Sequence, residues 1–218
     1  MTDRTAITRL REKASTERAQ LDALLDTTRV GHFALVAPDG HPVVIPTAIV
    51  RDGDRVLAHG STGSRWMRAL ADGAPTCLAV TALDGLVVAR TAFESSLHYR
   101  SAVVFGRCVP VEGADKLPAL DLITEALLPG RTVEIRRPND RELRATLVLA
   151  LPIAEWSLKV SDRWPEDEPE DIAGDAWAGV VPLASGYRPP RAAPDLRAGI
   201  DVPGSVRALT EPSGDPAQ

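Results

Sequence analysis

The residues best suited to bind a small anion lie in one short stretch, HGSTGSR, at residues 59–65. The stretch follows a strand-like run and precedes a helix-like one, so its hydroxyls and its guanidinium lie where a helix would begin. Unpaired amides and the helix dipole favour negative charge there, and an arginine can bind phosphate through two parallel hydrogen bonds. Serine and threonine also cap many helices without binding a ligand. By itself, the stretch leaves capping and anion binding both open.

A second polar cluster, FESSLHYRSAVVFG at residues 93–106, leads directly into an apolar strand. Arg100 and Ser101 lie where that strand starts. An arginine at such a boundary either pairs with a carboxylate such as Glu94 or reaches into a binding site. Both alternatives remain open. His98 and His59 could donate protons in such a site, although a structural role is the simpler interpretation for each.

These residues must be positioned by strands and short helices. Strand-like runs separated by Asp-Gly turns predict an antiparallel meander over residues 31–60. Pro46 cannot donate a ladder hydrogen bond, so its part of the second strand is an edge, a bulge, or a place where something other than a strand lies alongside. Further strands are expected at residues 76–83 and 86–93, joined by a turn at Asp84-Gly85, and at residues 99–112 and 146–160, the last bent at Pro152.

Helices are expected over residues 4–26, 61–73 and 114–128, and in a shorter piece capped by Asn139. Ser61 or Thr62 is the expected cap of the second helix. With six or seven strands, there are too few helices to cover both faces of an open sheet. The pattern therefore predicts a mainly β fold with flanking helices, in which the antiparallel strands form a closed or nearly closed barrel.

The composition predicts one domain with a tail. The chain has 218 residues, of which 44% are hydrophobic, enough for one good core. We expect the domain to span residues 1–183, with its N-terminal helical segment at 4–26. Residues 184–218 are rich in proline, glycine and alanine without periodicity, which is typical of a tail that is disordered or laid extended over a partner.

Charge and cysteine usage exclude several classes of function. A formal net charge of −5 disfavours binding to nucleic acid or to an anionic membrane. The N-terminus is too charged for a signal peptide and no stretch reaches about 20 apolar residues, so we expect a cytoplasmic protein. Cys77 and Cys108 lack CxxC spacing and are expected to be reduced core thiols. No metal site is expected from the four scattered histidines, and the acidic stretch at 166–171 is expected to be a solvated loop.

Three ordered segments, residues 30–70, 91–108 and 157–183, together resemble the pyridoxamine 5′-phosphate oxidase-like flavoprotein superfamily. Within it, the chain is most similar to the small flavin-nucleotide-binding proteins related to nitroimidazole-resistance reductases. The resemblance implies a six-stranded antiparallel split β-barrel that forms a homodimer, with FMN in clefts at the subunit interface. It also implies a role for Pro46, because a flavin edge beside the strand needs no ladder N–H at that position.

The resemblance implies the following cofactor-binding residues: Val44, Ile45, Pro46, Thr47 and Ala48 along the flavin ring, His59, Ser61, Ser64 and Arg65 at its phosphate end, and Arg100 and Ser101 in the same polar cleft. Lys159, Arg163 and Trp177 resemble positions that close the cleft from the neighbouring subunit. Residues 162–165 depart from the Arg-Thr-Gly stretch that relatives often carry there. The residues that bind the substrate's phosphate in true pyridoxamine phosphate oxidases are not recognisable, so vitamin B6 oxidation is not expected.

A homodimer is also favoured by the residues themselves. The strands at 43–50 and 102–105 carry apolar side chains on both faces. Together they have more apolar surface than the interior of one small barrel can bury. A second subunit would cover the excess.

The function that follows is an FMN-dependent oxidoreductase acting on an unidentified small molecule such as a nitroaromatic or a quinone. The chain contains no GxGxxG motif, so a nicotinamide reductant, NAD(P)H, would dock transiently on the flavin. No catalytic residue is assigned. The alternatives are a flavin- or heme-binding carrier or sensor without turnover, and a dimeric scaffold whose proline-rich tail meets partners.

Overall fold

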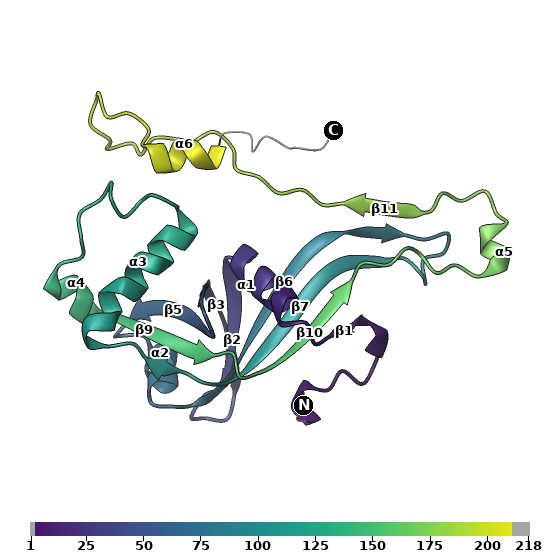
Figure 1. The fold of residues 1–218 in the computed structure, drawn as a ribbon, viewed down its shortest axis with the longest axis horizontal. Coiled ribbons are helices and arrows are strands. Elements are labelled where there is room, and N and C mark those ends of the chain that lie inside the picture. Colours follow the sequence, from purple (N-terminus) through teal and green to yellow (C-terminus); the bar gives the residue numbers. More distant parts are fainter. Residues whose placement is uncertain (1–2, 211–218) are drawn as a thin grey trace.

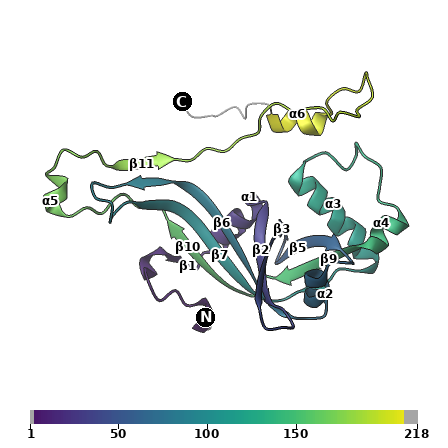
Figure 2. The same cartoon turned by 180° about the vertical axis from the view of Figure 1, so that it is seen from behind.

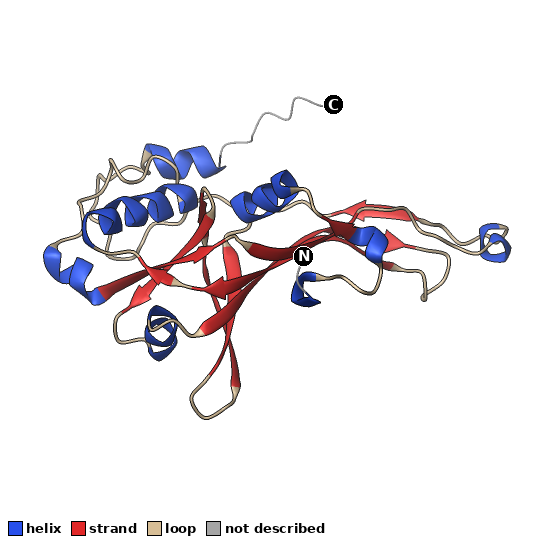
Figure 3. Cartoon of the chain, turned by 60° about the horizontal axis from the view of Figure 1, so that its bottom comes forward, coloured by secondary structure: helices blue, strands red, loops and turns tan. Residues whose placement is uncertain are grey.

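The computed structural model describes residues 3–210, which form two β-sheets flanked by short helices (Figures 1 and 3). Every strand pairing within that range is antiparallel. The seven-stranded sheet has the order β1-β10-β7-β6-β2-β3, with β11 also paired to β6, and the four-stranded sheet has the order β4-β5-β9-β8. The strands are β1 (Ala14–Ser15), β2 (Val30–Val36), β3 (Pro42–Ala48), β4 (Val50–Asp52), β5 (Arg55–Ser61), β6 (Pro75–Val88), β7 (Ser96–Arg107), β8 (Val109–Pro110), β9 (Thr146–Pro152), β10 (Glu155–Ser161) and β11 (Gly179–Pro182).

The chain passes between the two sheets at three corners. β3 leads into β4 through Ile49, β7 leads into β8 through Cys108, and β9 leads into β10 through residues 153–154, directly after Pro152. Ile49, Cys108 and Ile153 are buried, so the corners wrap around the core. The last strand, expected to be broken or bent at Pro152, is broken there into β9 and β10.

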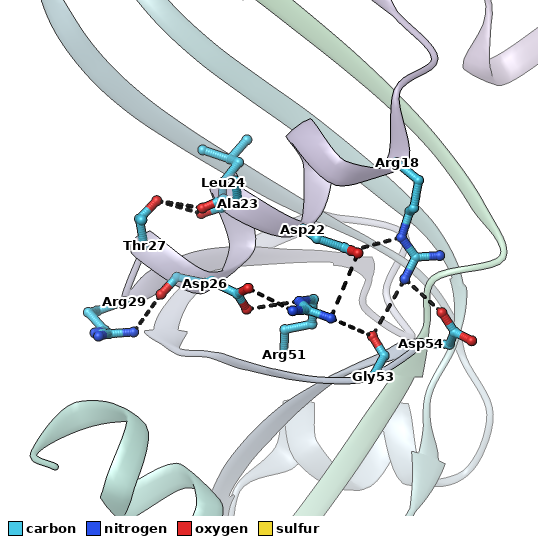
Figure 4. A network of polar contacts seen from close by, with 10 residues as sticks. All are labelled: Arg18, Asp22, Ala23, Leu24, Asp26, Thr27, Arg29, Arg51, Gly53 and Asp54. Carbon is cyan, nitrogen blue, oxygen red and sulfur yellow. Dashed lines mark hydrogen bonds and ion pairs between the residues drawn. The ribbon is translucent and has the colours of Figure 1, made fainter.

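Helix α1 (Arg18–Thr27) packs its buried leucines, Leu21, Leu24 and Leu25, into the main core against both sheets. Polar contacts then hold the helix to the turn between β4 and β5 (Figure 4). Arg51 Nη2 lies 2.6 Å from Asp26 Oδ2, and the Nη2 of Arg18 donates to Asp54 Oδ1 at 2.8 Å. Each of these arginines is bonded to a carboxylate.

A second core lies between helix α3 (Lys116–Leu127) and the four-stranded sheet, where Ala119 and Ile123 pack against Leu57 and Val148. Helix α4 (Asp140–Ala145) follows and begins with a capping box. Glu142 N donates to Asn139 Oδ1 at 3.0 Å, and Asn139 N donates to Glu142 Oε2 at 2.9 Å. The expected helix at 114–128 and the cap at Asn139 are confirmed.

The N-terminal segment is less helical than expected. Of residues 4–26 only α1 is an α-helix; before it lie the 3-10 turns η1 (Asp3–Thr5) and η2 (Arg11–Lys13) and the short strand β1. Leu10 is exposed, so this part of the chain buries no apolar stripe that would stabilise a helix. The expected helix at 61–73 is also shorter, because α2 spans Arg65–Ala71 and its N-cap is Ser64, not Ser61 or Thr62.

The prediction of a turn at Asp84-Gly85 is wrong, because β6 continues through these residues as one long strand. The pairing with β7 shifts register between Leu83 and Gly85, which marks a β-bulge. A Cβ at Gly85 would lie 2.7 Å from the carbonyl oxygen of Val181 in β11. The glycine therefore permits the close approach of β11 and does not form a turn.

The outer parts of β6, β7 and β10, together with β11 and helix α5 (Pro169–Ile172), form an arm that extends away from the four-stranded sheet (Figures 1 and 2). After β11 the chain runs extended along residues 183–202, which we call the strap; every residue of the strap is exposed. Helix α6 (Gly204–Thr210) ends the described part, where Ser205 N donates to Glu134 Oε1 at 3.0 Å. The predicted domain boundary after residue 183 stays a prediction, and residues 1–2 and 211–218 lie outside the described residues.

Candidate functional site

Strand β3, predicted to line a flavin ring, is the edge strand of the larger sheet and pairs only with β2. The edge position expected for Pro46 is therefore confirmed; in register it faces His32. Val44, Pro46 and Ala48 share the outer face of the sheet, whereas Ile45 and Thr47 are half-buried on the core side. An edge strand has a row of backbone groups without a ladder partner, and a flat ligand can lie along it.

The β5–α2 turn, residues 61–65, follows the end of β5, and β5 contacts β3. Ser64 N donates to Ser61 O at 3.0 Å, and Gly63 N donates to Ser61 Oγ at 3.1 Å. The Ser61 hydroxyl thus already accepts a bond within the turn, whereas the side chain of Ser64 makes no cap bond. Arg65 is exposed, and within residues 3–210 its guanidinium has no hydrogen bond or ion pair. Ser64 and Arg65 are consequently available to a ligand.

His59 lies just before this turn and is exposed at the end of β5. Desolvation by the surrounding protein lowers the pKa of His59 below its ordinary value. The imidazole is therefore neutral at pH 7 and does not add positive charge to the turn.

Arg100, predicted to share the cleft, is instead bonded to a neighbouring strand. Its Nε and Nη2 donate to the carboxylate of Asp84 on β6 at 2.9 and 2.7 Å. Of the two alternatives left open by the sequence, pairing is the one observed, with Asp84 in place of Glu94. The hydrogen bond raises the pKa of Arg100 and lowers that of Asp84.

Ser101 lies on the outer face of β7, beside Thr81 and Lys159 in register. Two strands, β2 and β6, separate β7 from β3. The structure thus places β3 in contact with β5, the strand that leads into the β5–α2 turn, but it does not bring Arg100 and Ser101 to them within one chain. Their convergence on one ligand stays a prediction that requires a second subunit.

The acidic stretch at 166–171 is only partly the solvated loop expected. The side chain of Asp167 is 1% exposed and accepts bonds from Arg90 N at 2.8 Å and Arg90 Nη1 at 2.9 Å. No local sequence signal marks this pair, because the two residues are far apart in the chain. Arg90 Nε is buried without a partner among the described residues.

The late segment also forms contacts within the arm. His98 Nε2 lies at hydrogen-bond distance, 2.8 Å, from the carbonyl oxygen of Arg163. Lys159 pairs with Ala14 and Ser101 in the sheet, and Trp177 is largely exposed, with its ring close to Gly179. Nothing within one chain closes a cleft with these residues, so their predicted role stays a prediction.

A cavity of about 820 Å³ lies elsewhere, between the N-terminal segment at residues 5–16 and β10, where Trp156 and Leu158 line it. It contains none of the predicted site residues. Across residues 3–210, no three His, Cys, Asp or Glu side chains lie close enough to hold a metal ion, and no helix is long and apolar enough to cross a membrane. Both cysteines are free thiols, with Cys108 buried and Cys77 half-buried.

Comparison with known proteins identifies the relatives of this chain. The family model for pyridoxamine 5′-phosphate oxidase matches residues 17–160, and none of the curated proteins matches. A FAD and heme binding protein from Mycobacterium smegmatis is 53% identical, with 91% of this chain and 97% of that one covered and a TM-score of 0.87. The flavocytochrome Anf3 from Azotobacter vinelandii is 35% identical, with 95% and 97% covered and a TM-score of 0.88.

A candidate 5-nitroimidazole antibiotic resistance protein from Bacteroides thetaiotaomicron is 18% identical, with 67% of this chain and 86% of that one covered and a TM-score of 0.57. At that identity it shares the fold alone. These similarities confirm the resemblance stated from the sequence and the split-barrel fold that it implied.

Proposed function

Because the chain belongs to the pyridoxamine 5′-phosphate oxidase family, we propose that it is a flavin-binding oxidoreductase, with the flavin ring along β3 and the flavin phosphate at the β5–α2 turn. The observation that carries the proposal is the exposed guanidinium of Arg65, unpaired among the described residues, after the end of β5, a strand that contacts the edge strand β3. The relative at 53% identity, whose name includes FAD, supports a flavin as the ligand.

The residues present fit a flavin. The edge of β3 offers backbone groups and, at Val44 and Pro46, apolar surface for a flat ring. Ser64 offers a hydroxyl and Arg65 a guanidinium to bind a phosphate. Because the pKa of His59 is lowered, the positive charge at this turn comes from Arg65. A bound flavin would supply hydride transfer from a reduced nicotinamide to a small-molecule acceptor, while the chain positions the ring and excludes water from one side.

The finer predictions from the sequence remain part of this proposal. FMN as the flavin, a nitroaromatic or quinone as the substrate, NAD(P)H as the reductant and a cytoplasmic location are all expected, and each awaits measurement.

Purified protein incubated with FMN or FAD and freed of excess ligand tests the proposal. We expect retained flavin absorption that is bleached by NADPH or NADH and recovers in air. Retention without bleaching would support the carrier alternative. A protein that retains neither flavin would contradict the proposed site.

We propose further that the protein is a homodimer, as the sequence suggests. Two observations support it. Val30 and Val36 on β2 and Val44 on β3, which faces Ala34 in register, share the outer face of the larger sheet and are 48%, 66% and 58% exposed. The strap is anchored at both ends, by β11 and by Ser205, yet every residue between is exposed. A second copy would cover both apolar surfaces.

Light scattering tests this proposal. We expect twice the chain mass of 23.3 kDa. The double variant L196S/I200S, which removes two exposed apolar side chains of the strap, should shift the protein toward monomer on dilution. Val133→Ser is the matched control, because Val133 is 89% exposed but lies outside the strap and the sheet. This variant should remain a dimer on dilution. A wild-type monomer at high concentration would contradict the dimer.

Heme as a second ligand is favoured by two of the similar proteins, since one is named for heme and the other as a flavocytochrome. Histidine is a common axial ligand of heme iron. The imidazoles of His32 and His59 make no hydrogen bond or ion pair in the described part of the chain, whereas His41 lies 3.4 Å from Asp39 and His98 bonds to Arg163. His32 and His59 are thus the candidates to hold heme.

Reconstitution with heme tests this second candidate by its absorption spectrum. A sharp Soret band is expected for the wild type. The band should be lost in at least one of the variants His32→Ala and His59→Ala. His41→Ala is the matched control. A spectrum identical to that of free heme, or one unchanged in both variants, would contradict it.

A further inference from the structure

The cavity of about 820 Å³ between the N-terminal segment and β10 has no role in the proposed function. The segment, residues 5–16, is fixed to β10 at two points (Figure 1). Arg4 Nε lies 3.3 Å from Glu155 Oε1 just before the segment, and near its end β1 pairs with β10, Ser15 facing Leu158. The chain between these two points therefore covers one side of a cavity whose volume suits a small-molecule ligand.

The lining of the cavity is largely apolar. Leu158 is buried in the main core, and Trp156 packs against that core but stays half-buried. The remaining apolar lining comes from Ile7 and from the alanines at 6, 14 and 154. The Trp156 ring stacks on no other aromatic ring in the part of the chain that the structure describes. It is therefore available to a flat aromatic ligand.

One unpaired cation lines the same cavity. Arg11 is exposed, and its guanidinium makes no hydrogen bond or ion pair with any other residue that the structure describes. Among the lining residues the acid is Glu155, which is already paired with Arg4. Glu12 follows Arg11 in the chain but does not line the cavity. An anionic group can thus bind at Arg11 without first breaking an ion pair.

The covering part of the segment contains a strained residue. Leu10, directly before η2, has φ 55° and ψ 54°, and no other non-glycine residue in the described range has a positive φ. This left-handed conformation is uncommon for leucine. Packing does not explain it, since Leu10 is 44% exposed. Strain of this kind is concentrated in segments that bind ligands, which supports a binding role for the cover.

We propose that this cavity binds a small aromatic acid, with the ring of the ligand against Trp156 and its acid group at Arg11. A carboxylate accepts two parallel N–H bonds from a guanidinium. The hydroxyls of Thr8 and Ser157 also line the cavity and make no hydrogen bond within the described residues, so they are free to bond to the ligand. The site shares no residue with β3 or the β5–α2 turn, and it does not depend on the proposed flavin.

Calorimetric titration of the full chain with naphthoate and with its uncharged counterpart naphthamide tests the site. The two probes share a ring system and differ in charge. Wild type should bind naphthoate about tenfold or more tightly than naphthamide. Arg11→Ala should abolish this preference. Arg9→Ala is the matched control, because Arg9 is exposed in the same segment but does not line the cavity, and it should keep the preference. The melting temperature of each variant confirms its fold.

Two further variants separate the parts of the site. Arg11→Lys keeps the charge but loses the planar fork, so it should retain part of the preference for naphthoate. Trp156→Leu removes the ring surface and should weaken both probes alike. Equal affinity of wild type for the two probes, binding of neither, or an unchanged preference in Arg11→Ala would overturn the site.

Saturation with FMN distinguishes this site from the flavin site. Naphthoate affinity should be the same with and without FMN. Competition between the two would assign the cavity to the flavin and overturn a separate site for an aromatic acid. A protein that binds naphthoate but retains no flavin would instead contradict the proposed function alone, so the two failures are distinguishable.

Discussion

The arm and the β5–α2 turn use the same residue type in opposite ways. In the arm, Arg100 is bonded to Asp84 and Arg90 to Asp167. At the turn, Arg65 has no partner in the part of the chain that the structure describes. An arginine whose donors are taken by a carboxylate holds strands together, whereas an unpaired one can bind a ligand without first breaking an ion pair. Under the proposed function, the arginines of the arm serve stability and that of the turn serves binding.

Arg90→Ala should produce the largest loss of stability. It leaves the carboxylate of Asp167, 1% exposed, with only a backbone donor. The loss of a charge-assisted bond to a buried group should cost about 2–3 kcal/mol, measured by urea unfolding with protease sensitivity of the arm as a second readout. Arg163→Ala is the matched control, since its pair with Glu166 is exposed at 3.6 Å. An equal loss of unfolding free energy in the two variants would contradict a special role of the buried Arg90–Asp167 pair in stability.

Arg100→Ala should have a smaller effect and a defined pH dependence. Its pair with Asp84 is about one-third exposed, so we expect a loss of about 1 kcal/mol. The hydrogen bond from Arg100 lowers the pKa of Asp84 in the folded state. The pair therefore stabilises the protein above the ordinary aspartate pKa of about 4 and loses that contribution as the pH falls through the lowered pKa.

Urea unfolding of wild type and Arg100→Ala at pH 6 and pH 3 measures the contribution of the Arg100–Asp84 pair to stability at each pH. The difference in unfolding free energy should be fully present at pH 6 and smaller at pH 3, where the pH is falling toward the lowered pKa of Asp84. A difference that persists unchanged at pH 3 would mean that the ion pair is not its source.

The thiols should show the smallest effects. Burial raises the pKa of Cys108 to about 12 and raises that of Cys77 as well. Because the thiolate is the reactive form, a disulfide reagent at pH 8 should label both slowly in the native protein, and Cys108 only after unfolding. The Cys77→Ser variant leaves Cys108 as the only thiol of the two, so its labelling can be followed by itself. Rapid native labelling of Cys108 would show that the corner between β7 and β8 opens.

Features set by local chemistry were predictable from the sequence. Pro46 indicated an edge because proline lacks a donor, and Asn139 with Glu142 three residues later formed the cap. The Asp84-Gly85 turn was wrong because β11, distant in sequence, lies against Gly85 and favours a bulge. Of the helical segment expected at 4–26, α1 formed around its buried leucines, whereas the part before it did not, because helix-forming residues without a buried face do not suffice.

The site was predictable where its residues are consecutive and not where they are distant. Strand β3 contacts β5, whose end carries the β5–α2 turn, while the shared role of residues 44–48 and the turn in binding a flavin stays a prediction. The sequence left open whether Arg100 pairs with a carboxylate such as Glu94 or enters a site, because Asp84 meets it only across the β6–β7 pairing.

The most direct test of the account compares Arg65→Ala with Arg9→Ala for FMN affinity by equilibrium dialysis. Arg9 is also exposed and has no partner among the described residues, but it lies outside the predicted site. We expect Arg65→Ala to weaken binding by about 1.5–3 kcal/mol, the contribution of a charge-assisted phosphate contact, and Arg9→Ala to leave it unchanged. Wild-type affinity in Arg65→Ala, or an equal loss in Arg9→Ala, would contradict the claim that Arg65 binds the flavin phosphate.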